Sequence, residues 1–456
     1  MKAIAQKLAS IVSESAICDW EHLPSMCQER LKRANPSENI PSCMVYPHTV
    51  EELKSVMSCA HSNGWSVLPC GSGSKLGWGG VGKNIDLVIS TERLNRVIEH
   101  AVGDLTVTVE AGVKLAHLQE LLLKENQFLP LDPAYPQQAT LGGIIATADS
   151  GSWRQRYGGV RDMLLGISFV RSDGQLAKAG GRVVKNVAGY DLMKLFTGSY
   201  GTLGFLTEST FRVYPIPEAS GTVVLTGEAE AMDATASHNA IASATKTLLA
   251  SALTPTAADL LSSQLVSTLG LGQGLGLMVR FQSVMESVKE QSSRLLEVGQ
   301  ALGLQGTVYT DADEVTLWQS LSEKIWAASQ EPAITCKIGV LPTAAVTTLT
   351  KLDALTSSTG LGLIHAASGL GRLRLDPATV TPEAIAPFGQ REAIAQLRRY
   401  CESQRGFLTV LEAPYLLKQQ LDVWGYSGNA LNIMRKIKEQ FDPKNILSPD
   451  RFVAGI

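Results

Sequence analysis

The sequence predicts an α+β fold built from two globular parts. Its 456 residues are enough for two or three domains of roughly 150 residues each. In the first half, segments with helical spacing of apolar residues alternate with strand-like segments, and glycine-rich loops separate them. Near residue 218, Tyr-Pro and Ile-Pro dipeptides precede a composition rich in Ala, Ser and Thr. We therefore predict a first domain over residues 1–218, a second over 219–428 and a C-terminal segment over 429–456.

Local signals define the elements of the first domain. Thr49 to Glu52 form a capping-box pattern that opens a helix, and Gly64 ends it. Ser172-Asp173-Gly174 predicts a hairpin turn. We expect a second helix over 115–122 and strands over 65–68, 86–90, 105–111, 165–171, 176–179 and 205–214.

The second half has the pattern of a separate α+β domain. Helical spacing extends through 228–271, and strands are predicted over 275–281, 333–341 and 361–366. A last helix over 429–441 ends before Pro443.

Composition excludes several classes of protein. A net charge of −3 lacks the basic surplus that general binding to nucleic acid requires. Seven cysteines without a C-x-x-C spacing provide neither a zinc ribbon nor an iron–sulfur ligand set, and scattered thiols fit a reducing compartment. The N-terminus lacks the apolar core of a secretion signal, and no apolar run is long enough to span a bilayer. We expect a cytoplasmic protein that contacts a membrane only through a partner.

The first glycine-rich loop, residues 69–84, fits two common nucleotide-loop templates poorly. Gly77 to Lys83 matches G-x-x-x-x-G-K, but Asn84 replaces the Ser or Thr that binds Mg²⁺ and a strand follows. A dinucleotide-binding G-x-G-x-x-G spacing is also absent, which argues against an NAD(P)-dependent dehydrogenase. A loop whose own N–H groups wrap a diphosphate, with Ser72 and Ser74 as hydroxyl donors, fits best. A tight surface turn is an equal alternative for this loop alone, but two later glycine clusters favour the cofactor interpretation.

Three segments together resemble the FAD-binding domain of the vanillyl-alcohol oxidase type. They are Pro69–Ser74; Leu131-Asp132-Pro133 with Thr140–Gly143 and Ser150-Gly151; and Lys185–Leu192 with Gly198–Gly204. The C-terminal stretches 422–425 and 441–452 are similar to the FAD-binding subunits of glycolate oxidase. The resemblance covers nearly the whole chain from about residue 40. It implies a two-part FAD-binding domain, an α+β cap domain over the flavin ring, and a last segment that returns to the FAD domain.

The resemblance also implies a cofactor and its ligands. Relatives that tether FAD through the first loop have a histidine where Ser74 stands, so we expect non-covalent FAD. Cys70, in the same loop, is either a redox thiol or, as we prefer, a small packing residue. The expected FAD-binding residues are Pro69, Cys70, Gly71, Ser72, Gly73, Ser74, Gly77, Pro133, Thr140, Gly142, Gly143, Ser150, Gly151, Gly204 and Phe205.

The cap departs from related 2-hydroxy-acid dehydrogenases. Those enzymes carry H-x-G-D-G-N-L-H, which binds a metal, whereas residues 367–374 here contain no histidine, so we expect no metal. Arg372 and Arg374 alternate on one strand face and are candidates for binding a substrate carboxylate, or else belong to a solvated edge strand. His365 is a candidate base or a buried structural histidine. Lys185 is a candidate for stabilising negative charge on reduced flavin.

Three functions remain open. The first is an FAD subunit of a glycolate dehydrogenase-like complex that takes part in oxidising a small 2-hydroxy acid. A related flavin subunit and an iron–sulfur subunit are its implied partners. The second is an autonomous FAD-dependent dehydrogenase of another small carboxylate, and the third is a non-catalytic scaffold.

Overall fold

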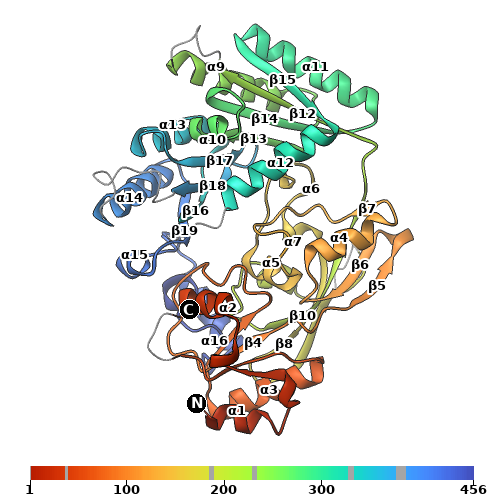
Figure 1. Cartoon of the computed structure of the whole chain (residues 1–456), viewed down its shortest axis with the longest axis vertical. Coiled ribbons are helices and arrows are strands. Elements are labelled where there is room, and N and C mark those ends of the chain that lie inside the picture. The colour runs from red at the N-terminus through yellow and green to blue at the C-terminus, as the bar shows by residue number, and fades with distance from the viewer. Residues whose placement is uncertain (1, 36–39, 184–188, 228–233, 327–332, 376–386) are drawn as a thin grey trace. The chain divides into compact units, whose positions relative to one another are not determined.

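The computed structural model describes residues 2–35, 40–183, 189–227, 234–326, 333–375 and 387–456. Its internal contacts divide the chain into two compact units. Unit 1 comprises Met1–Gly151, Gly158–Ile216 and Tyr426–Ile456, and unit 2 comprises Ser152–Tyr157 and Pro217–Gly425. Both units mix helices with strands (Figure 1), which agrees with the predicted α+β class. The sequence did not indicate that Ser152–Tyr157 would leave unit 1.

Unit 1 contains a four-stranded sheet ordered β1-β2-β4-β3. The strands are β1 (Ile17–Asp19), β2 (Cys43–Val45), β3 (Val67–Cys70) and β4 (Leu87–Ser90), with β2, β4 and β3 parallel. Helix α3 (Val50–Asn63) begins where predicted, and Thr49 Oγ1 caps it by accepting from the Glu52 N–H at 3.1 Å. The reciprocal bond of a capping box is shifted by one residue, because Glu52 Oε2 accepts from the His48 N–H at 2.7 Å and not from Thr49. The helix ends at Gly64, whose φ is +67°, a value that residues with a side chain rarely adopt. The first glycine-rich loop connects β3 to β4.

The second sheet of unit 1 has five antiparallel strands in the order β5-β6-β10-β8-β9. The predicted hairpin is present, because the Gly174 N–H donates to Arg171 O between β8 and β9. The strands are β5 (Val97–Ala101), β6 (Thr106–Glu110), β8 (Leu164–Val170), β9 (Leu176–Gly180) and β10 (Phe205–Arg212). The helices α4 (Leu115–Leu123), α5 (Leu141–Thr147) and α8 (Leu192–Phe196) share one hydrophobic core with this sheet.

Shorter elements complete unit 1. They are α1 (Lys2–Leu8), α2 (Ser25–Ala34), α7 (Val160–Met163), α16 (Leu431–Phe441) and the paired strands β7 (Gln127–Phe128) and β11 (Tyr214–Pro215). The C-terminal part lies against the first sheet, because the Val67 N–H donates to Ile446 O at 2.7 Å and Val67 O accepts from the Ser448 N–H. This segment therefore covers the outer edge of β3.

Unit 2 is built on an eight-stranded antiparallel sheet ordered β15-β12-β14-β13-β17-β18-β16-β19. Helices α9 (Ala234–Ala250), α11 (Met285–Ala301), α13 (Ala345–Leu355) and α14 (Pro387–Ser403) cover one face, and α10 (Ser263–Thr268) and α12 (Asp311–Trp326) cover the other (Figure 1). The unit also contains α15 (Tyr415–Gln420). The strands are β12 (Ala219–Gly227), β13 (Ala257–Leu261), β14 (Gln273–Ser283), β15 (Leu304–Thr310), β16 (Ile334–Gly339), β17 (Leu361–His365), β18 (Leu370–Leu375) and β19 (Phe407–Glu412).

The prediction of helix through 228–271 holds for α9 and α10 but is wrong for residues 257–261 between them. The helix α9 ends at Ala250, and strand β13 follows, paired on both sides with β14 and β17. Every residue of β13 is buried, so its Ala and Leu side chains fill the core on both faces of the sheet. Tertiary packing therefore overrides the helical preference of Ala and Leu in this stretch.

A short segment carries the chain from unit 1 into unit 2 and back. The helix α6 (Arg154–Tyr157) follows the predicted flavin residues Ser150 and Gly151 and contacts β13. Within the described residues, no helix has the length and apolar character needed to cross a membrane.

Candidate cofactor site

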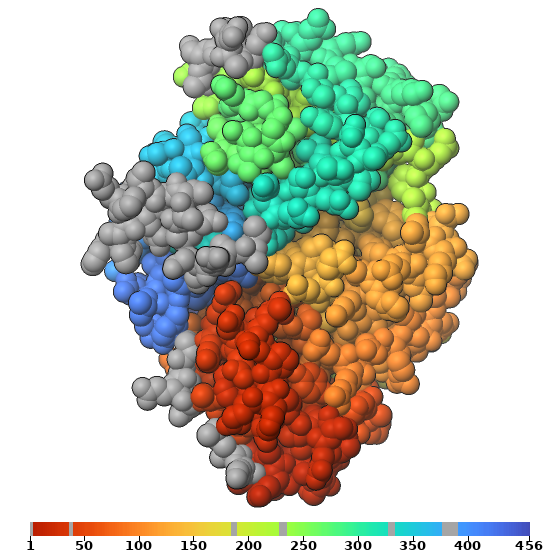
Figure 2. All heavy atoms as spheres, in the orientation of Figure 1, coloured from red at the N-terminus to blue at the C-terminus, as the bar shows by residue number. Residues whose placement is uncertain are grey.

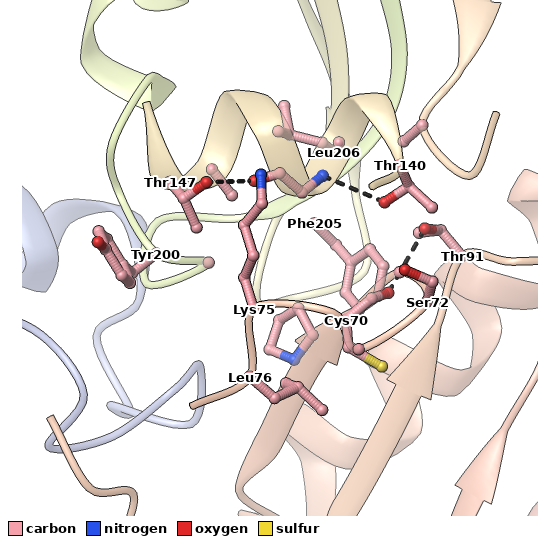
Figure 3. A pocket seen from close by; sticks show the side chains of 18 of the residues that line it. Cys70, Ser72, Lys75, Leu76, Thr91, Thr140, Thr147, Tyr200, Phe205 and Leu206 are labelled. Atoms are coloured by element: carbon pink, nitrogen blue, oxygen red, sulfur yellow. Dashed lines mark hydrogen bonds between the residues drawn. The ribbon is translucent and has the colours of Figure 1, made fainter. Parts of the chain in front are cut away.

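A cavity of about 820 Å³, part of it open to solvent, lies in unit 1 where the three predicted flavin segments meet (Figure 3). The first segment supplies the loop after β3, the second supplies the start of α5, and the third supplies residues 199–206. Of the predicted cofactor residues, the following line the cavity: Pro69, Cys70, Gly71, Ser72, Gly73, Ser74, Thr140, Gly142, Gly143, Gly204 and Phe205. The three segments, which span 137 positions from Pro69 to Leu206, thus contribute to one surface.

The first loop lies so close to the second segment that one of its glycines is required. A Cβ atom on Gly71 would lie 2.1 Å from Thr140 Oγ1. Ser72 Oγ donates to Gln138 O at 2.6 Å, so its single proton is already used within the protein. The expected role of Ser72 as a hydroxyl donor to a phosphate therefore does not fit this geometry.

A buried ion pair joins the first loop to the residues that precede Ser150. Lys75 Nζ lies 2.7 Å from Asp149 Oδ2, and the two side chains are 5% and 1% exposed. Asp149 Oδ2 also accepts from the Ala134 N–H at 2.8 Å. In Figure 3 the Lys75 side chain extends from the first loop toward α5. The pair fixes one wall of the cavity.

The second segment forms the start of α5, which packs closely on the end of β6. Thr140 caps the helix through Oγ1, which accepts from the Gly143 N–H at 3.4 Å. The Gly142 N–H donates to Ala111 O at 2.8 Å. A Cβ on Gly142 would lie 2.9 Å from Ala111 Cβ and 3.1 Å from its carbonyl oxygen, so backbone blocks a side chain here.

Gly142→Ala is accordingly expected to lower the free energy of unfolding by about 1–3 kcal/mol through overpacking, and to lower the FAD content. Gly103→Ala is the matched control, because nothing lies within 4 Å of its Cβ position. Urea unfolding and flavin absorbance measure both effects. Equal stability and flavin content in the two variants would contradict the close approach of α5 to Ala111.

The third segment is bound to α5 through its backbone. The Gly198 N–H donates to Ile145 O at 2.9 Å, and the Tyr200 N–H donates to Ala146 O at 2.8 Å. Gly201, with φ +73°, then turns the chain toward Gly204 and Phe205, which line the cavity.

Four predicted cofactor residues are not among the residues that line the cavity: Gly77, Pro133, Ser150 and Gly151. The Gly151 N–H donates to Asp132 Oδ1 at 2.9 Å, and a Cβ on Gly151 would lie 2.6 Å from that carboxylate. Gly151 is therefore explained by the fold of its own loop. Lys185 lies outside the described residues.

Sequence reasoning did not select several residues that line the cavity, among them Lys75, Thr91, Thr147, Tyr200 and Arg451. The guanidinium of Arg451 donates to Ala34 O, Leu76 O and Trp78 O, at 3.2, 2.8 and 2.8 Å. Burial lowers the pKa of Arg451 to about 10. Its place in the 441–452 stretch was the available signal, but the role of Arg451 depends on contacts across most of the chain.

Cys70 has the environment of a packing residue. Burial raises the pKa of its thiol above the ordinary range, and neighbouring Cys27 and Glu92 raise it further. The thiolate is the reactive form, so the redox interpretation loses support.

We expect Cys70 to resist alkylation in the folded protein near the ordinary thiol pKa of about 8.5 and to react after denaturation. Cys59 serves as the internal control for accessibility, because Cys59 and Cys70 are both half-buried in the structure. Peptide mass spectrometry measures the extent of alkylation at both cysteines. Labelling of Cys70 as fast as Cys59 in the folded protein would restore the redox interpretation.

The cationic candidates of unit 2 lie on an interior strand. Strand β18 runs between β17 and β16, and Arg372 and Arg374 are 6% and 4% exposed, so the solvated edge-strand alternative is wrong. Arg374 Nη1 donates to Ile325 O at 3.3 Å. The Arg372 guanidinium carbon lies 5.8 Å from the centroid of the Trp326 ring. Both side chains therefore lie on the α12 face of the sheet.

His365 is buried on the same sheet and has a carboxylate partner. Its Nδ1 lies 2.6 Å from Asp259 Oδ1, across the β13–β17 pair. Asp259 Oδ2 has no hydrogen-bond partner among the described residues. Among those residues there is also no group of three or more His, Cys, Asp or Glu that could hold a metal ion.

Two family models match the chain. Residues 41–180 match the FAD binding domain, and residues 418–452 match the C-terminal domain of FAD linked oxidases. Both matches include segments that line the cavity or, through Arg451, support it. The volume of the cavity and its lining by all three glycine-rich segments suit a bulky cofactor. The cofactor of this chain is FAD.

The relatives include full-length and partial matches. Glycolate oxidase subunit GlcD of Bacillus subtilis (strain 168) is 24% identical over 91% of this chain and 90% of its own. The mitochondrial D-lactate dehydrogenase [cytochrome] of Arabidopsis thaliana is 26% identical over 99% and 80%. Glycolate oxidase subunit GlcE of Escherichia coli (strain K12) is 40% identical, but only over 27% of this chain and 36% of its own.

Solved structures support the fold class. The structure of p-cresol methylhydroxylase with substrate bound matches with a TM-score of 0.78 and 16% identity, over 99% of this chain and 96% of the other. At this identity the likeness concerns the fold alone. It confirms the predicted type of FAD-binding fold with its α+β second part.

Proposed function

We propose that this FAD-linked oxidoreductase is the flavin subunit of a complex that oxidises a small 2-hydroxy acid and passes the electrons to a partner subunit. The observation that carries the proposal is the juxtaposition of buried cations and a His–Asp pair on the sheet of unit 2, in a chain whose unit 1 has an FAD cavity. The glycolate and D-lactate enzymes among its relatives support the substrate class.

The proposed chemistry divides between the cofactor and the side chains. Oxidation of a 2-hydroxy acid to the 2-oxo acid removes a hydride from Cα and a proton from the hydroxyl group. FAD, when bound, accepts the hydride. Arg372 and Arg374 bind the substrate carboxylate, and the packing of both side chains fixes their positions. His365 accepts the proton at Nε2, which has no hydrogen bond among the described residues, while Asp259 orients the ring through Nδ1.

The partners are proposed on the likeness to two glycolate oxidase subunits. GlcD matches most of the chain and GlcE matches one part of it, so a related flavin subunit is the first partner to test. An iron–sulfur subunit is the second proposed partner and would take the electrons onward.

Anaerobic absorbance spectroscopy tests this function. Glycolate, D-lactate and 2-hydroxyglutarate are added to the holoprotein, alone and with the purified related flavin subunit, and acetate and propionate serve as controls without a hydroxyl group. We expect a 2-hydroxy acid to bleach the flavin band in the complex. Bleaching of the chain alone would favour the autonomous dehydrogenase. A flavin that stays oxidised in both samples would contradict the proposal and favour the scaffold.

Arg372→Met and Arg374→Met test the carboxylate role. A lost hydrogen bond to a charged group costs about 1.5–3 kcal/mol, so each variant is expected to weaken substrate binding by roughly 10- to 100-fold. Arg294→Met is the control, because Arg294 is exposed and forms a surface ion pair with Glu290 one helical turn away. The concentration of substrate that half-bleaches the flavin is the readout. If this concentration is unchanged in both variants, the arginines do not bind the substrate carboxylate.

A further inference from the structure

Strand β15 (Leu304–Thr310) forms an open edge of the unit 2 sheet. It pairs with β12 on one side, and no described residue hydrogen-bonds to its other side. Residues 305–308 are all exposed, and Val308 retains 41% of its surface. In Figure 2 the green to turquoise chain around β15, α11 and α12 lies at the surface. The unpaired N–H and C=O groups of such an edge are available to another strand.

The other sheet edges are protected by devices that β15 lacks. The outer side of β19 is covered, because the Val410 N–H donates to Val423 O at 2.7 Å. β3 is covered by residues 446–448 in the same way. β5 carries Glu99 and a bulge, β9 carries Lys178, and β1 has only three residues. These are the usual means by which a protein prevents strand pairing.

β15 instead has the composition of a strand that pairs. Its seven residues, Leu-Gln-Gly-Thr-Val-Tyr-Thr, contain no charge and no proline, and the register with β12 is unbroken. Exposed apolar side chains flank it: Met285 at the start of α11 is 44% exposed, and Val315 on α12 is 51% exposed. With Val308 they line a hollow beside the strand.

We propose that β15 is a dimerisation edge, which pairs antiparallel with β15 of a second copy of this chain. A two-fold axis at Thr307 places Thr307 opposite itself, Gly306 opposite Val308 and Gln305 opposite Tyr309. No like charges meet in this register, and the Thr–Thr pair is favourable. Such an isologous contact closes on itself and joins the two sheets into one of sixteen strands.

The mixed charges beside β15 favour a second copy of this chain over a partner that is strongly acidic or strongly basic. The hollow beside β15 is lined by acidic residues (Glu218, Asp311 and Glu314) and by basic ones (Arg280 and Lys289). Glu314 and Arg280 already pair at 3.0 Å. A strongly acidic or basic partner would meet groups of its own sign, whereas a second copy presents the same balanced surface.

Sedimentation velocity of the holoprotein tests the proposal. We expect the wild type to sediment as a dimer and Thr307→Lys as a monomer, since two ammonium groups then face each other across the axis. Ile98→Lys is the matched control on β5, an edge strand protected by Glu99 and a bulge, where the Ile98 side chain is 44% exposed, and this variant should remain dimeric. Unchanged flavin content and circular dichroism show that both variants fold.

A cysteine pair tests the register. Directly opposed residues have Cα atoms about 4.5–5.5 Å apart, within reach of a disulfide. Under mild oxidation Thr307→Cys is therefore expected to form a covalent dimer, whereas Gln305→Cys, which faces Tyr309, and the wild type are not. A monomeric wild type, a Thr307→Lys variant that remains dimeric, or equal cross-linking at 305 and 307 would each overturn the proposal.

Discussion

Lys75→Met is expected to lower the free energy of unfolding by about 3–5 kcal/mol and to deplete the protein of FAD. The substitution removes the cation that pairs with Asp149, a carboxylate that is 1% exposed and whose Oδ2 accepts from the Ala134 N–H at 2.8 Å. The negative charge then stays in the interior without its lysine. The loss also releases the first loop from the second segment, so the wall of the cavity is no longer fixed. Urea unfolding and the flavin-to-protein absorbance ratio measure the two effects.

Two further variants separate charge from shape. Lys83→Met removes a largely exposed lysine of the same loop, whose Nζ lies 3.8 Å from Asp450 Oδ1. The free energy of unfolding is expected to change by less than about 1 kcal/mol, because exposed ion pairs contribute little. The double variant Lys75→Met/Asp149→Asn removes the buried charge and is expected to recover part of the stability. If Lys75→Met behaves like Lys83→Met, the ion pair does not hold the cavity.

Lys438→Met is expected to destabilise unit 1 by a similar amount, about 3–5 kcal/mol. Lys438 Nζ donates to Asp442 Oδ2 at 2.6 Å, to Leu447 O at 2.8 Å and to Thr202 O at 3.0 Å. Burial lowers the pKa of Lys438, while Asp442 raises it. One ammonium group thus links the C-terminal segment to the third segment of the cavity.

Lys436→Met on the same helix is the control, since Lys436 is exposed. We expect it to unfold like the wild type. Thermal unfolding followed by flavin fluorescence reports both the stability and the release of cofactor. A Lys438→Met variant that retains its FAD and its midpoint would show that the C-terminal segment does not support the cavity.

Signals that lie within a few residues predicted structure well. The Thr49 cap of α3, the Gly174 hairpin and the alternation of Arg372 with Arg374 on one strand face each depend on neighbours in sequence. The glycine segments also converge on one cavity. Their order along the chain, together with the resemblance, made this prediction possible.

Features that depend on distant contacts were missed. Lys75 pairs with a carboxylate 74 positions away, and Arg451 binds carbonyl groups up to 417 positions away. The residues next to Lys75 and Arg451 in the sequence do not indicate which distant groups these side chains contact. Strand β13 was mistaken for helix, because only its neighbours β14 and β17 decide its conformation. The diversion of residues 152–157 into unit 2 likewise depends on packing with β13.

We propose that unit 1 holds FAD without a covalent bond, in the cavity between the three segments. The most direct measurement is to denature the purified native chain, separate protein from supernatant and quantify the flavin in each by absorbance and mass spectrometry. We expect one FAD per chain, all of it in the supernatant, and much less from Gly142→Ala than from Gly103→Ala. Flavin that stays with the denatured protein would contradict non-covalent binding, and a chain without flavin even after reconstitution would contradict the assignment of the cavity.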